Sequence, residues 1–202
     1  MIKTFENVLK PSYAILLQNQ ILNTNEISWN WVENTAYNHV SQQEEWNFSW
    51  VHHVYNDNQI LSNLYSYLMP LILDLADSAD LLVEDIGRIR IGCITQTPEN
   101  IIHTPHIDLS CPHYTACFYI NDSDGDTIIY NEVYPFGYTN IPHDEYAYSL
   151  NFTELHRHQP KFNSAVLFDG AHYHSSTSPS KNARRVVITM NFTARQKDLN
   201  QL

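Results

Sequence analysis

The chain has few cysteines, few basic residues and no long apolar run. Its three cysteines, Cys93, Cys111 and Cys117, form no Cys-x-x-Cys pair, so we expect reduced thiols, with neither a disulfide framework nor a zinc knuckle. The longest apolar run, residues 68–75, contains a proline and an aspartate and is too short to span a bilayer. The first residues contain no long apolar segment followed by a cleavage site. We therefore predict a cytoplasmic protein with no membrane partner.

Basic residues are outnumbered two to one. Eleven Lys and Arg stand against 22 Asp and Glu, which gives a net charge of −11 with histidine neutral. No run of Lys or Arg forms a basic patch, and such a field repels a phosphate backbone, so the composition argues against a general nucleic-acid binder. The same net charge mildly favours a neutral or basic substrate. A length of 202 residues suits one domain.

The spacing of apolar residues divides the chain into two parts. Residues 57–75 have helical spacing, with Asp57 or Asn58 as the expected cap and Pro70 expected to kink or divide the helix. Residues 134–160 are rich in prolines and are expected to be an irregular lid or substrate loop. The expected strands are residues 27–31, 46–54, 86–96, 114–121, 127–133, 165–168 and 185–192. This order predicts helices packed on a β-sandwich or jelly roll.

The segment Thr104-Pro105-His106-Ile107-Asp108 contains a possible metal-binding pair. Residues i and i+2 of a strand point to the same face, so His106 and Asp108 would reach one metal ion together. A His-x-Asp motif is short and frequent by chance, and it therefore needs a third ligand elsewhere in the chain.

His174 is the candidate for that third ligand. Two histidines and one carboxylate on one face of a metal leave three open positions, the arrangement preferred for non-heme Fe(II) oxygen chemistry. His172 would point to the same strand face and is the rival ligand. An arginine ten or eleven residues after His174 could hold a carboxylate bidentately. Arg185 would share a face with Thr189 and therefore suits a charged ligand, whereas Arg184 would share the apolar face.

In order and spacing these motifs resemble the 2-oxoglutarate/Fe(II)-dependent oxygenases, in particular the small prolyl-4-hydroxylase-like members of bacteria and their viruses. The family pattern is His-x-Asp, an apolar strand ending in Tyr-Leu-Asn, a Gly-Gly-Thr-like turn, and His followed by Arg. The corresponding residues here are 106–108, 115–121, 125–127, His174 and Arg184 or Arg185. Asp126 replaces the second glycine of the turn. The resemblance covers residues 86–193.

The resemblance implies a fold, cofactors and roles. The fold would be mostly β with flanking helices, a double-stranded β-helix (jelly roll) formed by residues 86–193, with residues 1–85 as support within a single domain of residues 1–202. His106, Asp108 and His174 would be the catalytic iron ligands. Arg185 or Arg184, with Tyr119, would hold the far carboxylate of 2-oxoglutarate. Fe(II), 2-oxoglutarate and O2 would together hydroxylate a peptide or small molecule, releasing succinate and CO2.

Two alternatives to this function stay open on sequence grounds. One is a non-catalytic jelly-roll binding or structural protein that keeps the fold. The other is nucleobase demethylation by the same chemistry, which the acidic composition disfavours.

Several further residues have a structural interpretation. His103 and His113 are expected at the surface or near the ligands. The run Asp122-x-Asp124-x-Asp126 lacks the glycine and glutamate of a calcium loop, so we predict a solvated turn.

Overall fold

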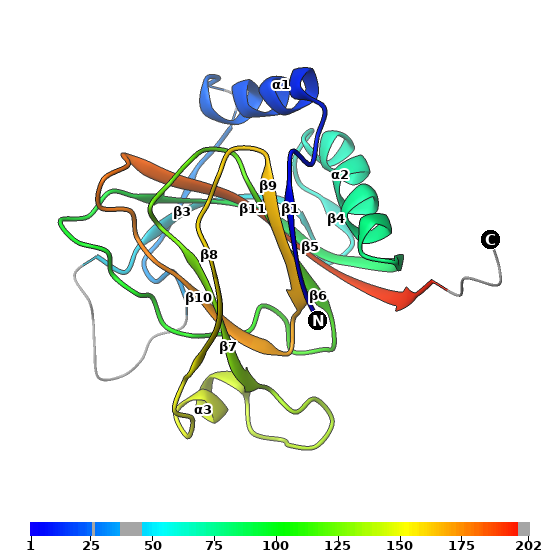
Figure 1. Ribbon diagram of the computed structural model, residues 1–202, viewed down its shortest axis with the longest axis vertical. Coiled ribbons are helices and arrows are strands. Elements are labelled where there is room, and N and C mark those ends of the chain that lie inside the picture. Colours follow the sequence, from blue (N-terminus) through cyan, green and yellow to red (C-terminus); the bar gives the residue numbers. More distant parts are fainter. Residues whose placement is uncertain (26, 37–45, 198–202) are drawn as a thin grey trace.

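Two antiparallel sheets form the centre of the molecule (Figure 1). The computed structural model describes residues 1–25, 27–36 and 46–197. The elements of the first half are β1 (Ile2–Glu6), α1 (Pro11–Leu22), β2 (Asn30–Val32), β3 (Ser49–Asn56), β4 (Gln59–Ile60), α2 (Tyr65–Ser78) and β5 (Leu81–Thr95). The second half contains β6 (Tyr114–Tyr119), β7 (Thr127–Val133), α3 (His143–Ala147), β8 (Glu154–His158), β9 (Ser164–Asp169), β10 (His172–Ser176) and β11 (Arg184–Gln196).

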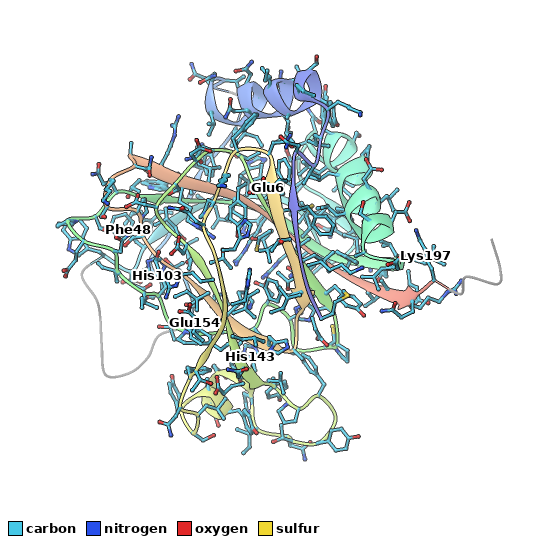
Figure 2. All side chains as sticks on the ribbon, in the orientation of Figure 1. Glu6, Phe48, His103, His143, Glu154 and Lys197 are labelled. Atoms are coloured by element: carbon cyan, nitrogen blue, oxygen red, sulfur yellow. The ribbon has the colours of Figure 1, made fainter. Side chains whose placement is uncertain are left out.

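The large sheet has the strand order β1-β9-β6-β11-β5-β3-β2, with β4 paired to β3, and the small sheet has the order β10-β7-β8. Strands that are neighbours in space are mostly distant in sequence, and together the two sheets form the jelly roll that the sequence predicts. Figure 2 shows side chains filling the space between the sheets. β11 lies at the centre of the large sheet between β5 and β6. The side chains on its two faces therefore lie at the middle of both sides of that sheet.

The outer face of the large sheet is covered by α1 and α2 (Figure 1). Val186, Ile188 and Met190 of β11 pack in one apolar cluster with Leu17 of α1 and Leu71 of α2, all nearly inaccessible to water. Burial of each such side chain contributes about 1.5–3 kcal/mol, so this cluster is the main source of stability. The opposite face of β11, which includes Arg185 and Thr189, lines the interior of the roll.

The start of the helix predicted over residues 57–75 is wrong. Asp57 and Asn58 have positive φ angles of 50° and 60° and form the turn between β3 and β4. Asn and Asp tolerate this left-handed conformation, which two-residue hairpin turns require. α2 begins only at Tyr65, and it continues through Pro70, so this proline does not divide the helix.

The prediction that residues 134–160 are irregular is also only partly right. This stretch contains α3 and β8, and β8 pairs with β7 to complete the small sheet. The alternation of β8 is difficult to recognise because the residues opposite Thr127 and Ile129 are His158 and His156, and neither is apolar. None of the helices in the described ranges is long and apolar enough to cross a bilayer.

The aspartate-rich turn is held by a specific network. The carboxylate of Asp124 accepts hydrogen bonds from the backbone N–H groups of Ser180 (3.1 Å), Lys181 (3.0 Å) and Asn182 (3.0 Å). Burial opposes the charged form, but these donors outweigh it and hold the pKa of Asp124 well below its usual range. The carboxylate therefore connects the turn of residues 122–126 to the loop before β11. The prediction of a solvated turn is wrong in this respect.

Candidate metal centre

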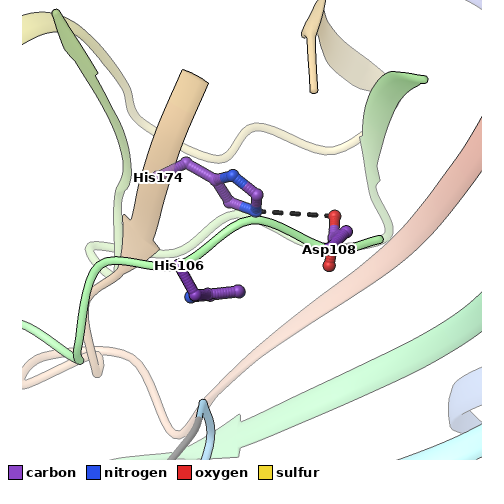
Figure 3. A group of neighbouring side chains, drawn as sticks. All are labelled: His106, Asp108 and His174. Atoms are coloured by element: carbon purple, nitrogen blue, oxygen red, sulfur yellow. Dashed lines mark ion pairs between the residues drawn. The ribbon is translucent and has the colours of Figure 1, made fainter. Parts of the chain in front are cut away.

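His106 and His174 are held together by their backbones. The N–H of each donates to the carbonyl of the other, at 2.9 Å in both directions, so the two residues form an isolated antiparallel bridge. The segment before β6 therefore lies against β10, and the two imidazole centroids are 4.6 Å apart. The expectation of a strand at 106–108 holds only for this bridge, because the chain bends at Asp108. Figure 3 shows both rings beside the Asp108 carboxylate.

Both rings are placed to bind a metal ion through Nε2. Nδ1 of His106 is 3.0 Å from the Thr104 carbonyl, and Nδ1 of His174 is 3.3 Å from the His172 carbonyl. A carbonyl only accepts, so with a cation bound Nδ1 of each ring would donate to its carbonyl and Nε2 would be the ligand atom. Burial, and then the neighbouring His174, lowers the pKa of His106 to about 3, which keeps this imidazole neutral at physiological pH.

Asp108 is almost fully enclosed, with 1% of its side chain exposed. Oδ1 is paired with the guanidinium groups of Arg88 and Arg90, the latter at 3.3 Å. Oδ2 accepts hydrogen bonds from the Asn191 amide at 2.9 Å and the Thr115 hydroxyl at 3.3 Å. Burial by itself would raise the pKa of Asp108, but Arg88, then His174 and Arg90, hold it well below its usual range. The carboxylate is therefore ionised and fixed in orientation.

These three side chains fit a divalent cation. Ligand atoms of His106, Asp108 and His174 all lie within 4.8 Å of one another, and Nε2 of His174 is 3.5 Å from Oδ2 of Asp108 (Figure 3). Two neutral imidazoles and one carboxylate match the preference of Fe(II) for mixed nitrogen and oxygen donors. Among the residues that the structure describes, no other group of three or more His, Cys, Asp or Glu side chains comes together in this way.

Arg185 lies in the cavity next to this centre. It is only 4% exposed, and the cavity it lines also includes His106, His174 and Thr189. Its Nε donates to the Gly125 carbonyl at 2.9 Å. Arg184, in contrast, is exposed and lines a surface depression on the opposite side of the sheet, as the alternation of a strand requires.

Tyr119 lies behind the cavity wall. Its hydroxyl donates to Oγ1 of Thr127 at 2.7 Å, and Nη2 of Arg185 donates to the same oxygen at 2.6 Å. Burial raises the pKa of Tyr119, so its phenol stays protonated. Thr127, and not Tyr119, lines the cavity. Sequence reasoning missed Thr127, although it is the last residue of the Gly-Asp-Thr turn.

His172 does not join the metal-binding group. A register shift in β10 separates it from His174, and its Nδ1 is 2.8 Å from the Tyr130 carbonyl. His103 and His113 are 1% and 5% exposed, so of the two positions expected for them, at the surface or near the ligands, the surface position is wrong. Nδ1 of His103 is 2.8 Å from Oγ of Ser176, which lines the cavity.

Arg88 and Arg90 were also missed by sequence reasoning. The available signal was the alternation Arg88-Ile89-Arg90-Ile91 on β5, which places both arginines on the inner face of the sheet, opposite Asn191 and Thr189. A charged residue at an inward position needs a partner, and Asp108 is that partner.

The fold is that of the 2-oxoglutarate/Fe(II) oxygenases, including prolyl hydroxylases. A 2OG-Fe(II) family oxidoreductase from Burkholderia pseudomallei is similar with a TM-score of 0.60 and 11% identity, over 95% of this chain and 85% of that one. A Pseudomonas putida prolyl-4-hydroxylase has a TM-score of 0.52 and 12% identity, over 96% and 92%. HygX from Streptomyces hygroscopicus, with nickel and 2-oxoglutarate bound, has a TM-score of 0.55 and 13% identity, over 95% and 82%.

Sequence comparisons add no relative. No protein-family model matches the chain, and no curated protein matches it. At identities of 11–13% the three structural likenesses show the fold alone. The activity therefore has to be argued from the site.

Proposed function

We propose that this chain is a 2-oxoglutarate-dependent non-heme iron oxygenase that hydroxylates a small molecule or a peptide side chain. The observation that carries the proposal is the enclosure of His106, Asp108 and His174 next to a buried, cavity-lining arginine. A binding or structural protein with the same fold has no need for three converging metal ligands. It also has no need for a buried guanidinium in the cavity that these ligands border.

The residues of the chain divide the work as follows. His106, Asp108 and His174 would hold Fe(II) on one face and leave its other positions open. Arg185 would bind the far carboxylate of 2-oxoglutarate, and Thr127 would add a hydroxyl to the same carboxylate. Bound iron would supply the oxidising chemistry: of the two atoms of O2, one would enter the hydroxylated substrate and the other the succinate that forms, with CO2, from 2-oxoglutarate.

Tyr119 supports this site from behind. Its hydroxyl fixes Thr127, and its ring lies 5.6 Å from the Arg185 guanidinium carbon, within the range of a cation–π contact. Its role would thus be to position Arg185 and Thr127 and not to touch the cosubstrate.

The test is a pair of measurements on the purified protein. Anaerobic Fe(II) plus 2-oxoglutarate should produce a weak visible charge-transfer band that is absent from His106→Ala. In air, the wild-type protein should form succinate from 2-oxoglutarate with any accepted substrate. A filled metal site that gives neither band nor succinate would favour the non-catalytic alternative.

Arg185 and Arg184 provide a matched pair of variants. Arg185→Gln should weaken 2-oxoglutarate binding by about 100-fold, since a charge-assisted bidentate contact contributes roughly 3 kcal/mol. Arg184→Gln should leave it unchanged, because that side chain lies outside the cavity. Equal effects of the two substitutions would contradict the assignment of Arg185.

A further inference from the structure

The metal centre contains more positive charge than iron and 2-oxoglutarate need. The guanidinium groups of Arg88 and Arg90 pair with one carboxylate, Asp108, and a third guanidinium, that of Arg185, lines the same cavity as Arg90. The side chains therefore carry two net positive charges. A divalent metal and the doubly charged 2-oxoglutarate cancel each other, so this excess stays after both have bound. Among the residues that the structure describes, those lining the cavity include no Asp or Glu that would offset it.

The excess is local, because the chain as a whole has a net charge of −11. A guanidinium group is always protonated in proteins, so Arg88 and Arg90 both carry a positive charge. Uncompensated charge inside a protein is costly unless a ligand or water offsets it. A concentrated positive site in an acidic protein therefore indicates a function for that charge.

The geometry makes two of these arginines available to a ligand. Asp108 uses only one amino group of Arg90, and no other hydrogen bond of this guanidinium is found within the described part of the chain. Side-chain exposure is 16% for Arg88 and 25% for Arg90, so both reach water, whereas Arg185 is enclosed. Arg90 also lines the cavity that contains His106 and His174.

The positions along β5 and β11 separate the two ends of the site. Arg185 lies opposite Ile94, Thr189 opposite Arg90, and Asn191 opposite Arg88. Arg90 and Arg88 are thus displaced along the strands from Arg185 toward Asp108, at the metal end. A ligand held by these two arginines would lie next to the metal and away from the far carboxylate of 2-oxoglutarate.

We propose that Arg90 and Arg88 form a second anion site at the metal centre, and that the oxidised substrate is a small molecule bearing a carboxylate or phosphate group. This inference rests on the proposed function. It replaces the expectation of a neutral or basic substrate, which considered only the net charge. The carboxylate of Asp108 keeps the two guanidinium groups together, and the substrate anion binds their remaining N–H groups.

The first experiment uses Mn(II)-loaded protein saturated with 2-oxoglutarate, which holds the site without turnover. Sodium sulfate is titrated into this complex at constant ionic strength, and binding is measured by calorimetry. Wild-type protein should bind sulfate with millimolar affinity. Arg90→Gln and Arg88→Gln should each weaken it at least tenfold, whereas the surface variant Arg184→Gln should not change it.

Arg90→Lys guards against a folding defect, because it keeps the charge and should retain most of the sulfate affinity. Near-ultraviolet circular dichroism checks the fold of each variant. If 2-oxoglutarate does not bind wild-type protein, the proposed function itself fails. If it binds but sulfate affinity is independent of Arg90 and Arg88, only the anion site is overturned. A third outcome is that Arg90→Gln loses as much 2-oxoglutarate affinity as Arg185→Gln. That result would assign Arg90 to the cosubstrate and would also overturn the anion site.

A turnover screen tests the substrate class directly. Each carboxylated or phosphorylated metabolite is paired with its methyl ester, and succinate formation with Fe(II) is measured. The acid should stimulate turnover at least tenfold more than the ester. A substrate whose neutral ester is accepted equally well would contradict the proposal.

Discussion

Removing the Asp108 carboxylate should destabilise the protein even when no metal is present. In Asp108→Ala the guanidinium groups of Arg88 and Arg90 lose the anion that holds them together, and they repel each other. Breaking a buried ion pair costs about 3–5 kcal/mol. Because the two arginines keep some access to water, we expect the lower end, about 3 kcal/mol. For a chain of this length that corresponds to a fall of roughly 6–12 °C in the melting temperature.

The assay is urea unfolding of metal-free protein in the presence of a chelator, followed by circular dichroism. A double-mutant cycle isolates the electrostatic part: Arg88→Met should cost stability in the wild-type background but recover about 1 kcal/mol or more in Asp108→Ala. His106→Ala removes a metal ligand without unpairing a charge and is the control for loss of packing. If Asp108→Ala lies within 1 kcal/mol of wild type, or Arg88→Met gives no recovery, the account of this charge cluster is wrong.

Four further predictions follow from particular contacts. His174→Ala should weaken Mn(II) binding at least 100-fold in calorimetry and His172→Ala less than threefold, since only His174 converges with the other ligands. Burial lowers the pKa of His103 to about 4, so the unfolded chain binds the proton more readily, and stability present above about pH 6.5 is lost as the pH falls toward 4. At pH 5 the contribution of His103 to this loss should be about 2 kcal/mol, so His103→Gln should lose about 2 kcal/mol less stability than wild type in urea unfolding. Asp124→Ala should cost about 2 kcal/mol in thermal unfolding by releasing three backbone donors, and added Ca²⁺ should stabilise neither protein. In Gly170→Ala the new Cβ would lie 2.2 Å from Nε2 of His113, so the ring must move, at a cost of about 1–3 kcal/mol; unchanged stability would refute this contact.

Motif order made the candidate metal ligands recognisable in the sequence. Local periodicity does not identify these residues as one group, because His106 and Asp108 lie on an irregular segment and His174 is distant in sequence. Their order relative to an apolar strand and an arginine does identify them. Alternation along β11 correctly separated the two arginines, because a regular strand places consecutive side chains on opposite faces. β6, β7 and β9 were predictable for another reason, because short runs rich in apolar and β-branched residues between turn signals indicate buried strands.

What the sequence did not reveal depends on contacts between distant residues. β8 turns histidines toward the interior, and its assignment therefore depends on its pairing with β7. In the sequence Arg88 and Arg90 resemble surface charges, and only their shared ion pair with Asp108 shows their role. The same is true of Asp124, whose donors come from a loop near the start of β11. In each case a polar residue is held by a partner, distant in sequence, that no local pattern identifies.

The reciprocal backbone hydrogen bonds between His106 and His174 make these two residues a single mechanical unit. The two backbone segments cannot move apart without breaking this pair of amide contacts, so the close placement of the two imidazoles persists as long as β10 stays paired with the preceding segment. Slow amide hydrogen exchange at these two residues would report on that pairing.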